Sequence, residues 1–207
     1  MPPVLGRGQP AKSAGTDVAE YLHAPRSPVH AGLGQTPQSP WGRLHSLSGK
    51  GCERGLTWIK PSFLWMMYRC GWATKPGQET VLAVEITRDG FEWALRNACL
   101  SSYVRGLHPD LSSWQRELKR SPARVQWDPE RDLRLQPLPY RSLQLGLSGE
   151  AVQRYADEWL VSISDVTPLA REIHALVTSG DLDAASGLLP KETPYPAQGE
   201  LLTHLHG

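Results

Sequence analysis

Proline and glycine are concentrated at the start of the chain. Residues 1–56 contain seven prolines and nine glycines, and neither a two-residue nor a 3.6-residue apolar repeat persists there. Such a segment cannot bury enough apolar surface to offset the conformational entropy that folding removes. We therefore expect residues 1–56 to be disordered, and residues 191–207 to form a flexible tail.

Charge and cysteine content narrow the classes of protein to consider. With 22 basic and 21 acidic residues, attraction of the whole molecule to nucleic acid or to an anionic membrane is not expected, although a local patch is compatible with this balance. No apolar run approaches the roughly 18–20 residues that span a bilayer, and the start lacks a secretory signal. Three cysteines without metal-binding spacing favour a reducing compartment. We expect a cytoplasmic protein.

Apolar periodicity and turn residues predict regular structure from Thr57 onward. Strands are predicted over residues 57–60, 81–86, 125–127, 133–138, 142–147 and 160–163. Helices are predicted over residues 62–69, 89–98, 111–119, 148–158, 167–178 and 181–189, the second opened by Asp89 and Glu92 and the fourth by Ser148. This order indicates an α+β domain over residues 57–190, with a single mixed or antiparallel sheet and flanking helices.

Two sequence blocks, WIKPSFLWMMYR and QWDPER, are distinctive. With the sequence around them, over roughly residues 57–175, they resemble the domain-of-unknown-function family numbered 4291. That family has no assigned reaction, so the resemblance implies no activity, substrate or cofactor for this chain.

The first 56 residues depart from the pattern of that family. Its members usually open with an Arg-containing strand and a Tyr-Gln-Ala-Tyr block, and residues 1–56 contain no match to either. Their mixture of Pro, Gly, Ser, Arg and His is the one expected from a GC-rich coding region read out of frame. We hypothesise that this segment is aberrant or mis-started, in which case the chain lacks part of the family's site.

A first candidate site surrounds the start of the helix predicted at residues 62–69. Pro61 suits the first position of a helix, whose free N–H groups attract anions, and Lys60 lies beside it. Four residues recur at three- and four-residue spacing and therefore share a helix face: Ser62, Trp65, Met66 and Arg69. Core packing suffices to explain Trp65 and Met66, whereas Lys60 and Arg69 are candidates for binding a phosphate or carboxylate.

The block QWDPER contains a second candidate. In a functional interpretation, Trp127 stacks on a base or ring while Asp128 or Glu130 acts as an acid or base. In a structural one, Asp128 before Pro129 forms a simple turn, and Glu130 belongs to a solvated ion pair.

Arg141 is the third candidate, because it heads a strand predicted to be buried. A buried guanidinium needs an anion, either a ligand phosphate or a carboxylate of the protein. Glu85 is the internal partner that we expect, and an Arg141–Glu85 pair is favoured over a ligand site.

Motifs for metals and nucleotides are absent from the sequence. No His or Cys pair has ligand spacing in an element predicted to be ordered, so we expect no metal site, and neither GxxxxGK[ST] nor GxGxxG occurs. No cofactor is identified.

Three classes of function remain. The first is a nucleotide-binding domain with transferase-like activity, similar in architecture to ADP-ribosyltransferases, whose ligand contacts Lys60, Arg69, Trp127 and Arg141. The second is a module for single-stranded nucleic acid. Its stacking rings would be Trp58, Trp72 and Trp127, and its phosphate contacts Lys60, Arg69 and Lys75. The third is a structural or interaction domain without enzymatic activity.

Overall fold

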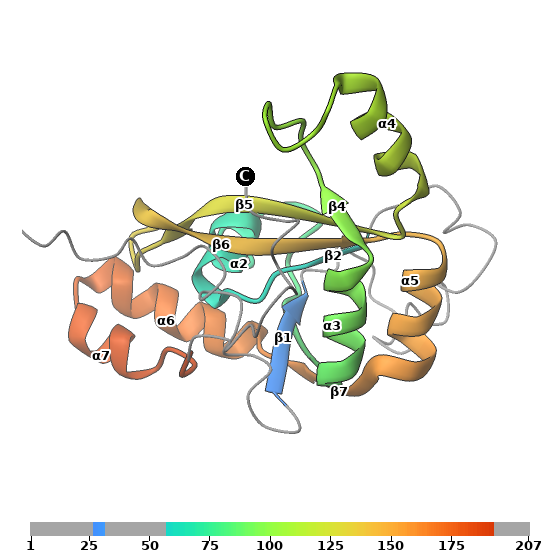
Figure 1. Ribbon diagram of the computed structural model, residues 1–207. Coiled ribbons are helices and arrows are strands. Elements are labelled where there is room, and N and C mark those ends of the chain that lie inside the picture. Colours follow the sequence, from blue (N-terminus) through green and yellow to red (C-terminus); the bar gives the residue numbers. More distant parts are fainter. Residues whose placement is uncertain (1–26, 32–56, 193–207) are drawn as a thin grey trace, which may run out of the picture.

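The computed structural model describes residues 27–31 and 57–192, whose strands form two sheets (Figure 1). In the first sheet, three antiparallel strands are ordered β1-β3-β7: β1 (Ser27–Ala31), β3 (Leu82–Ile86) and β7 (Leu160–Asp165). In the second, four strands are ordered β2-β6-β5-β4: β2 (Thr57–Ile59), β6 (Pro137–Leu147), β5 (Ala123–Arg131) and β4 (Ala98–Leu100). The helices are α2 (Phe63–Cys70), α3 (Arg88–Arg96), α4 (Leu111–Arg120), α5 (Glu150–Arg154), α6 (Thr167–Ser179) and α7 (Leu182–Gly187).

The predicted α+β class is confirmed, but the strands form two sheets instead of the single sheet expected. β3 is hydrogen-bonded to β1 on one edge and to β7 on the other, so it has no free edge with which to join β2. Apolar periodicity indicates which face of a strand is buried, and it carries no information about the strand's partners. Both sheets contribute side chains to one core cluster, together with α2 and α3.

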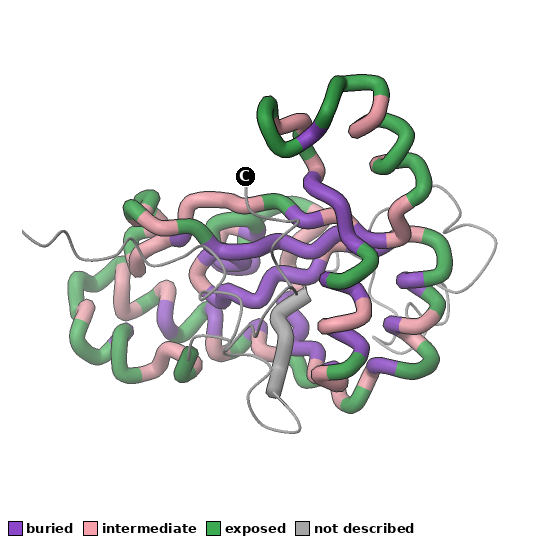
Figure 2. The backbone as a smooth tube through the Cα atoms, viewed as in Figure 1, coloured by how far each residue is buried: buried purple, intermediate pink, exposed green. Residues whose placement is uncertain are grey.

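The most regular alternation in the sequence lies in this core. Leu143, Leu145 and Leu147 on β6 are fully buried, and Ala123 and Val125 on β5 face the same side. Figure 2 shows buried residues running along the strands, whereas α4 stands out from the body and is mostly exposed.

The helix of the WIKP block lies one residue further along the chain than predicted, and Pro61 precedes its cap residue instead of taking the first helical position. Ser62 caps α2, because its Oγ accepts a hydrogen bond from the backbone N–H of Trp65 at 3.0 Å, and Gly71 ends the helix in the left-handed conformation. The expected cap of α3 is wrong: Thr87, and not Asp89, accepts from the N–H of Gly90 at 3.3 Å. Asp89 instead lies in the first turn of α3.

The QWDPER block lies in a strand and the residues after it form a turn, so two predictions are corrected. Asp128 and Pro129 belong to β5, so they do not form the simple turn considered above. The irregular strand expected at residues 133–138 is also wrong, because a tight connection over residues 132–136 leads to β6, which starts at Pro137. The pairing register shifts between Pro129 and Arg131, and such an irregularity accommodates a residue that lacks an N–H.

The strand β4 was not predicted, because Ala98 continues the apolar face of α3. The helix instead ends at Arg96, with Asn97 as its C-cap, and β4 pairs in parallel with β5, so that α4 lies in the crossover between them. Cys99 is therefore a buried strand residue.

The helix expected at residues 148–158 is divided. α5 ends at Arg154 and continues as a π-helical turn, Tyr155–Trp159 (η2), which leads directly into β7. Ser148 does not cap α5, since its Oγ donates to the carbonyl of Pro122 at 3.2 Å.

Five residues of the segment expected to be disordered, Ser27–Ala31, pair with β3 as β1. The rest of residues 1–56 and residues 193–207 lie outside the described residues. The expectations of disorder there and of an aberrant N-terminal segment stay predictions.

Candidate functional site

The two faces of the four-stranded sheet differ in character. Ile59 pairs with Leu145, and both are fully buried in the core. Lys60 and Gln144 come next to this pair on their strands, so their side chains leave the opposite face. Asp128 shares that face, because it pairs with Ser142, two residues from Gln144. One face of the sheet is therefore apolar, and the other carries polar and charged groups.

Lys60 is buried on this polar face without an ionic partner in the described part of the chain. Only 7% of the residue is exposed, and its Nζ lies 5.7 Å from the ring centroid of Trp58 and 5.4 Å from that of Trp65. These distances are typical of cation–π contacts. Among the described residues, no oxygen forms a salt bridge or hydrogen bond with the Lys60 ammonium.

The pKa of Lys60 is lowered from 10.5 to about 8, mainly by burial and also by the charge of Arg69, while Asp128 acts in the opposite direction. At neutral pH the amine is thus still mostly protonated, in surroundings that penalise its charge.

A glycine lets Trp58 approach the sheet. Trp58 pairs with Gly146, and a Cβ atom on Gly146 would lie 3.2 Å from three atoms of the Trp58 ring. The indole therefore lies against the backbone of β6, beside Lys60.

Two further polar atoms near Lys60 are buried and have no hydrogen-bond partner in the described part of the chain: the donor Trp65 Nε1 and the acceptor Gln144 Oε1. Buried polar atoms in native proteins are nearly always hydrogen-bonded. Five residues, here named the Lys60 cluster, thus combine an unpaired cation, an unpaired donor and an unpaired acceptor: Trp58, Lys60, Trp65, Asp128 and Gln144.

The start of α2, predicted to receive a ligand anion, is occupied by carboxylates of the protein itself. Ser62 Oγ donates to Glu130 Oε1 at 2.7 Å, and the backbone N–H of Phe63 donates to Glu192 Oε1 at 2.9 Å. Glu130 Oε1 also accepts from the N–H of Arg131 at 2.7 Å. An anionic ligand would therefore meet Lys60 and not the helix start.

The four predicted ligand-binding residues divide between the two faces of the sheet. Lys60 is buried in its cluster, and Arg69 is exposed but close enough to lower the pKa of Lys60. Trp127 pairs with Leu143 and packs against the core, on the face opposite to Lys60. Arg141 follows the same alternation as Leu143, and its Nη1 donates to the carbonyl of Trp127 at 3.0 Å. A cleft shared by all four side chains is not formed.

The predicted Arg141–Glu85 pair is wrong. Arg141 is exposed on β6, whereas Glu85 lies in the other sheet and accepts a hydrogen bond from Ser162 Oγ at 2.7 Å. An exposed guanidinium keeps its hydration and needs no internal carboxylate.

The three tryptophans proposed as stacking platforms do not form one surface. Trp72 is 4% exposed and stacks on His174, with ring centroids 5.6 Å apart and an interplanar angle of 2°. Trp58 and Trp127 belong to opposite faces of the four-stranded sheet.

Gln144 was missed by sequence reasoning, although a signal for it existed. It is the polar residue between Leu143 and Leu145, so the alternation that predicts the core face also places it on the opposite face. The partnership of Ser62 with Glu130 has no local signal, since the residues are 68 positions apart.

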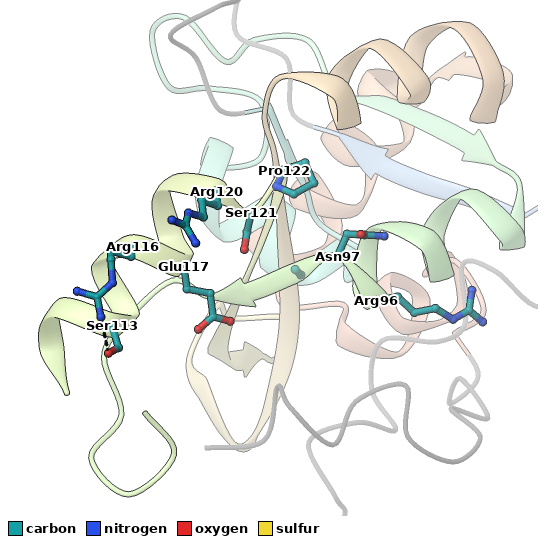
Figure 3. A pocket seen from close by; sticks show the side chains of 9 residues that line it. Arg96, Asn97, Ser113, Arg116, Glu117, Arg120, Ser121 and Pro122 are labelled. Carbon is teal, nitrogen blue, oxygen red and sulfur yellow. Dashed lines mark hydrogen bonds between the residues drawn. The ribbon is translucent and has the colours of Figure 1, made fainter. Parts of the chain in front are cut away.

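A second polar region, also missed, lies at the β4 edge of the sheet. A shallow hollow of about 520 Å³ is bounded by the end of α3, the start of β4 and one face of α4 (Figure 3). The residues around it are mainly polar or charged: Arg96, Asn97, Ser113, Arg116, Glu117, Arg120 and Ser121, with Ala98 and Pro122. We name this region the arginine hollow.

Comparison with protein families gives a match over residues 48–195, more than half of the chain, to the family described as Domain of unknown function (DUF4291). The chain belongs to this family. The resemblance inferred from the WIKPSFLWMMYR and QWDPER blocks is thereby confirmed, and in this DUF4291 chain both blocks contribute residues to the Lys60 cluster. A search of curated proteins found no match.

The described residues of this DUF4291 domain contain neither a membrane-spanning helix nor a metal-binding cluster. No helix there is both long and apolar enough to cross a membrane. In the same residues, no group of three or more His, Cys, Asp or Glu side chains is placed to hold a metal ion.

Proposed function

We propose that this domain binds a nucleotide or another small molecule carrying a phosphate, with the Lys60 ammonium as the phosphate contact. The observation that carries the proposal is the unpaired, buried charge of Lys60. An ammonium that is removed from water without a partner destabilises a fold by roughly several kcal/mol. Such a residue is expected where a ligand supplies the opposite charge.

The neighbours of Lys60 support a nucleotide over a simple anion. Trp65 Nε1 is a free donor for a phosphate oxygen, and Gln144 Oε1 is a free acceptor for a hydroxyl or amino group. A nucleotide carries both kinds of group, and its base or ribose can lie against the Trp58 indole. Inorganic phosphate would leave the ring contact unused.

A transferase reaction stays a prediction within this proposal. The cluster offers one carboxylate for acid–base chemistry, Asp128, whose two oxygens accept hydrogen bonds from Gln126 Nε2 at 3.0 and 3.1 Å.

A cytoplasmic location is also part of the proposal. Cys70 and Cys99 are free thiols, as is usual in a reducing compartment where nucleotides are abundant.

The test is a titration of the purified full chain with ADP-ribose, NAD and ATP at pH 7, by calorimetry and by thermal shift. A ligand present at 100 times its dissociation constant should stabilise the fold by about 2.7 kcal/mol. Lys60→Met should weaken binding at least about tenfold, which corresponds to about 1.4 kcal/mol for a lost charge-assisted contact.

Lys119→Met is the matched control, because it removes an exposed lysine of α4 and leaves the cluster intact. Binding that is equally strong in the Lys60→Met protein would overturn the assignment. If none of the three ligands binds, the proposal that this domain binds a nucleotide is wrong.

A further inference from the structure

We propose that the arginine hollow binds the phosphodiester backbone of a nucleic acid, independently of the Lys60 cluster. The proposal rests on the segregation of charge, the shape of the hollow and the exposure of α4.

Positive charge is concentrated in the segment that forms the hollow. Residues 96–124 contain six of the 22 basic residues and only two of the 21 acidic ones: Arg96, Arg105, Arg116, Lys119, Arg120 and Arg124 against Asp110 and Glu117. The rest of the chain is therefore net acidic, although the whole protein is nearly neutral. A local positive field of this kind attracts a polyanion without any overall basic character.

One face of α4 directs this charge at the hollow. Ser113, Arg116, Glu117 and Arg120 are three or four residues apart, so they share a helix face, and all border the hollow. Figure 3 shows these side chains on α4, across from Asn97 and Arg96 at the end of α3. Arg96 is held by Glu92 at 2.6 Å, which leaves Arg116 and Arg120 as the main guanidinium groups available to a ligand.

Neither guanidinium is used to hold the fold together. α4 contains no buried residue, and Arg116 Nη2 donates only to Ser113 Oγ, at 2.9 Å, within the same helix. No carboxylate forms a salt bridge with Arg116 or Arg120 among the described residues. Exposed guanidinium groups keep their hydration, so they cost little in the free protein and can exchange water for phosphate oxygens.

The helix itself is firmly placed despite its exposure. Asp110 caps it, with Oδ1 accepting from the N–H of Ser113 at 2.7 Å, and Trp114 Nε1 donates to the carbonyl of Leu100 at 2.9 Å. Tyr103 lies edge-on to Trp114, with ring centroids 6.4 Å apart. The basic face is thus presented on a fixed element.

An open hollow suits a strand better than a single nucleotide. Its walls hold no aromatic residue on which one base could be enclosed, and Lys119, also on α4, adds an exposed positive charge outside it. A strand that crosses the surface can use several such charges in succession, which is how sequence-independent binding works.

The experiment measures fluorescence anisotropy of a labelled 15-nucleotide oligo-U RNA and of a 15-base-pair DNA duplex, with the full chain, from 50 to 300 mM salt. We expect binding at 50 mM salt that weakens steeply as salt rises. The double variant Arg116→Gln, Arg120→Gln should bind about tenfold more weakly or worse at 50 mM salt. Its salt slope should be smaller by about 1.4 for the single strand, or 0.7 for each lost phosphate contact.

The matched control is Arg134→Gln with Arg171→Gln, which removes two exposed arginines that do not border the hollow. It should leave affinity within about twofold of the unchanged protein. Preference for the RNA or for the duplex identifies which nucleic acid supplies the backbone.

Three outcomes would overturn the proposal. They are no binding of either probe at 50 mM salt, equal loss in the control variant, and full affinity in the Arg116→Gln, Arg120→Gln protein. A fourth outcome would also overturn it. If millimolar ATP displaces the RNA as well as an oligonucleotide with the same total concentration of phosphate groups does, the hollow binds free nucleotides instead. A result of this kind leaves the Lys60 proposal untouched, since that proposal is tested with its own variant.

Discussion

The Lys60 cluster and the arginine hollow handle positive charge in opposite ways. In the cluster, one ammonium is buried between two indole rings, and its pKa is lowered to about 8 because burial penalises the charged form. In the hollow, Arg116 and Arg120 are exposed on a helix without any buried residue. We expect the first charge to destabilise the free protein, and in our proposal a ligand compensates it, whereas the second pair should be nearly neutral for stability. Substitutions that remove the charge of Lys60 are therefore expected to weaken ligand binding and to stabilise the fold. Substitutions in the hollow are expected to weaken binding without changing stability.

The largest effect on stability is expected at Trp159, a buried side chain that serves as a reference for the two regions. Trp159 is 3% exposed at the corner between η2 and β7, and it packs on Gly90 and on Trp93, whose ring centroid is 5.5 Å away. Trp159→Ala should lower the free energy of unfolding by about 3–5 kcal/mol. Urea denaturation monitored by circular dichroism would measure it. A loss below about 1 kcal/mol would contradict the burial on which the comparison depends.

The second largest effect is expected in the pH dependence of the free energy of unfolding, because of Lys60. Lys60 has a pKa of about 8 in the folded protein and about 10.5 when unfolded, so between these values the unfolded chain binds more protons. Stability should rise with pH across that window, by about 3 kcal/mol in total, relative to a protein without Lys60. Denaturation of the unchanged protein and of Lys60→Met at pH 7, 8, 9 and 10 gives this difference. Parallel curves would show that the pKa of Lys60 is not lowered.

Nucleotide binding should respond to the same titration with the opposite sign. Above pH 8 the Lys60 ammonium loses its proton, so the affinity for a nucleotide should fall while the stability of the free domain rises. A single group with these two opposed effects distinguishes a ligand-compensated charge from a purely structural one.

At pH 7, replacing Lys60 by a neutral side chain of similar length should stabilise the free domain. Lys60→Met removes the unpaired charge and keeps the contacts with Trp58 and Trp65, so we expect a gain of about 1–3 kcal/mol. Melting curves without ligand would test this prediction. A clear destabilisation would mean that the ammonium has a partner in the protein.

The smallest effect on stability is expected at the hollow. The double variant Arg116→Gln, Arg120→Gln should change the free energy of unfolding by less than about 0.5 kcal/mol, because both residues are exposed and form no salt bridge with another described residue. A loss above about 1 kcal/mol would show that α4 depends on these side chains, and would remove the contrast between the two regions.

The sequence predicted the elements with strong local signals and missed those set by distant partners. α2 was located from Pro61 and Gly71, and the leucines of β6 from their alternation, because caps and periodicity act over a few residues. β4 was missed because three apolar residues continue the pattern of α3, and only pairing with β5 makes them a strand. The division into two sheets has the same origin, since edge partners are long-range contacts.

The candidate site was predicted only in part. Lys60 was singled out by its position beside Pro61, whereas Trp65 was assigned to core packing. The ligand contact expected at the helix start is filled by Glu130 and Glu192. Trp127 and Arg141 were grouped with Lys60 because they lie in distinctive or isolated positions of the sequence. The alternation of side chains along β5 and β6 places Trp127 and Arg141 on the other face, a distinction that requires the strand register.

The hydrogen bond from Phe63 to Glu192 joins residues 129 positions apart, and it makes the two ends of the described domain interdependent. Lys191 directly precedes that glutamate, so tryptic cleavage at this peptide bond would detach the carboxylate from the first turn of α2. That turn carries Trp65, one of the two rings around the Lys60 ammonium. Proteolysis or shortening at the carboxyl end would thus be felt at the tryptophan-lined lysine, far away in the sequence.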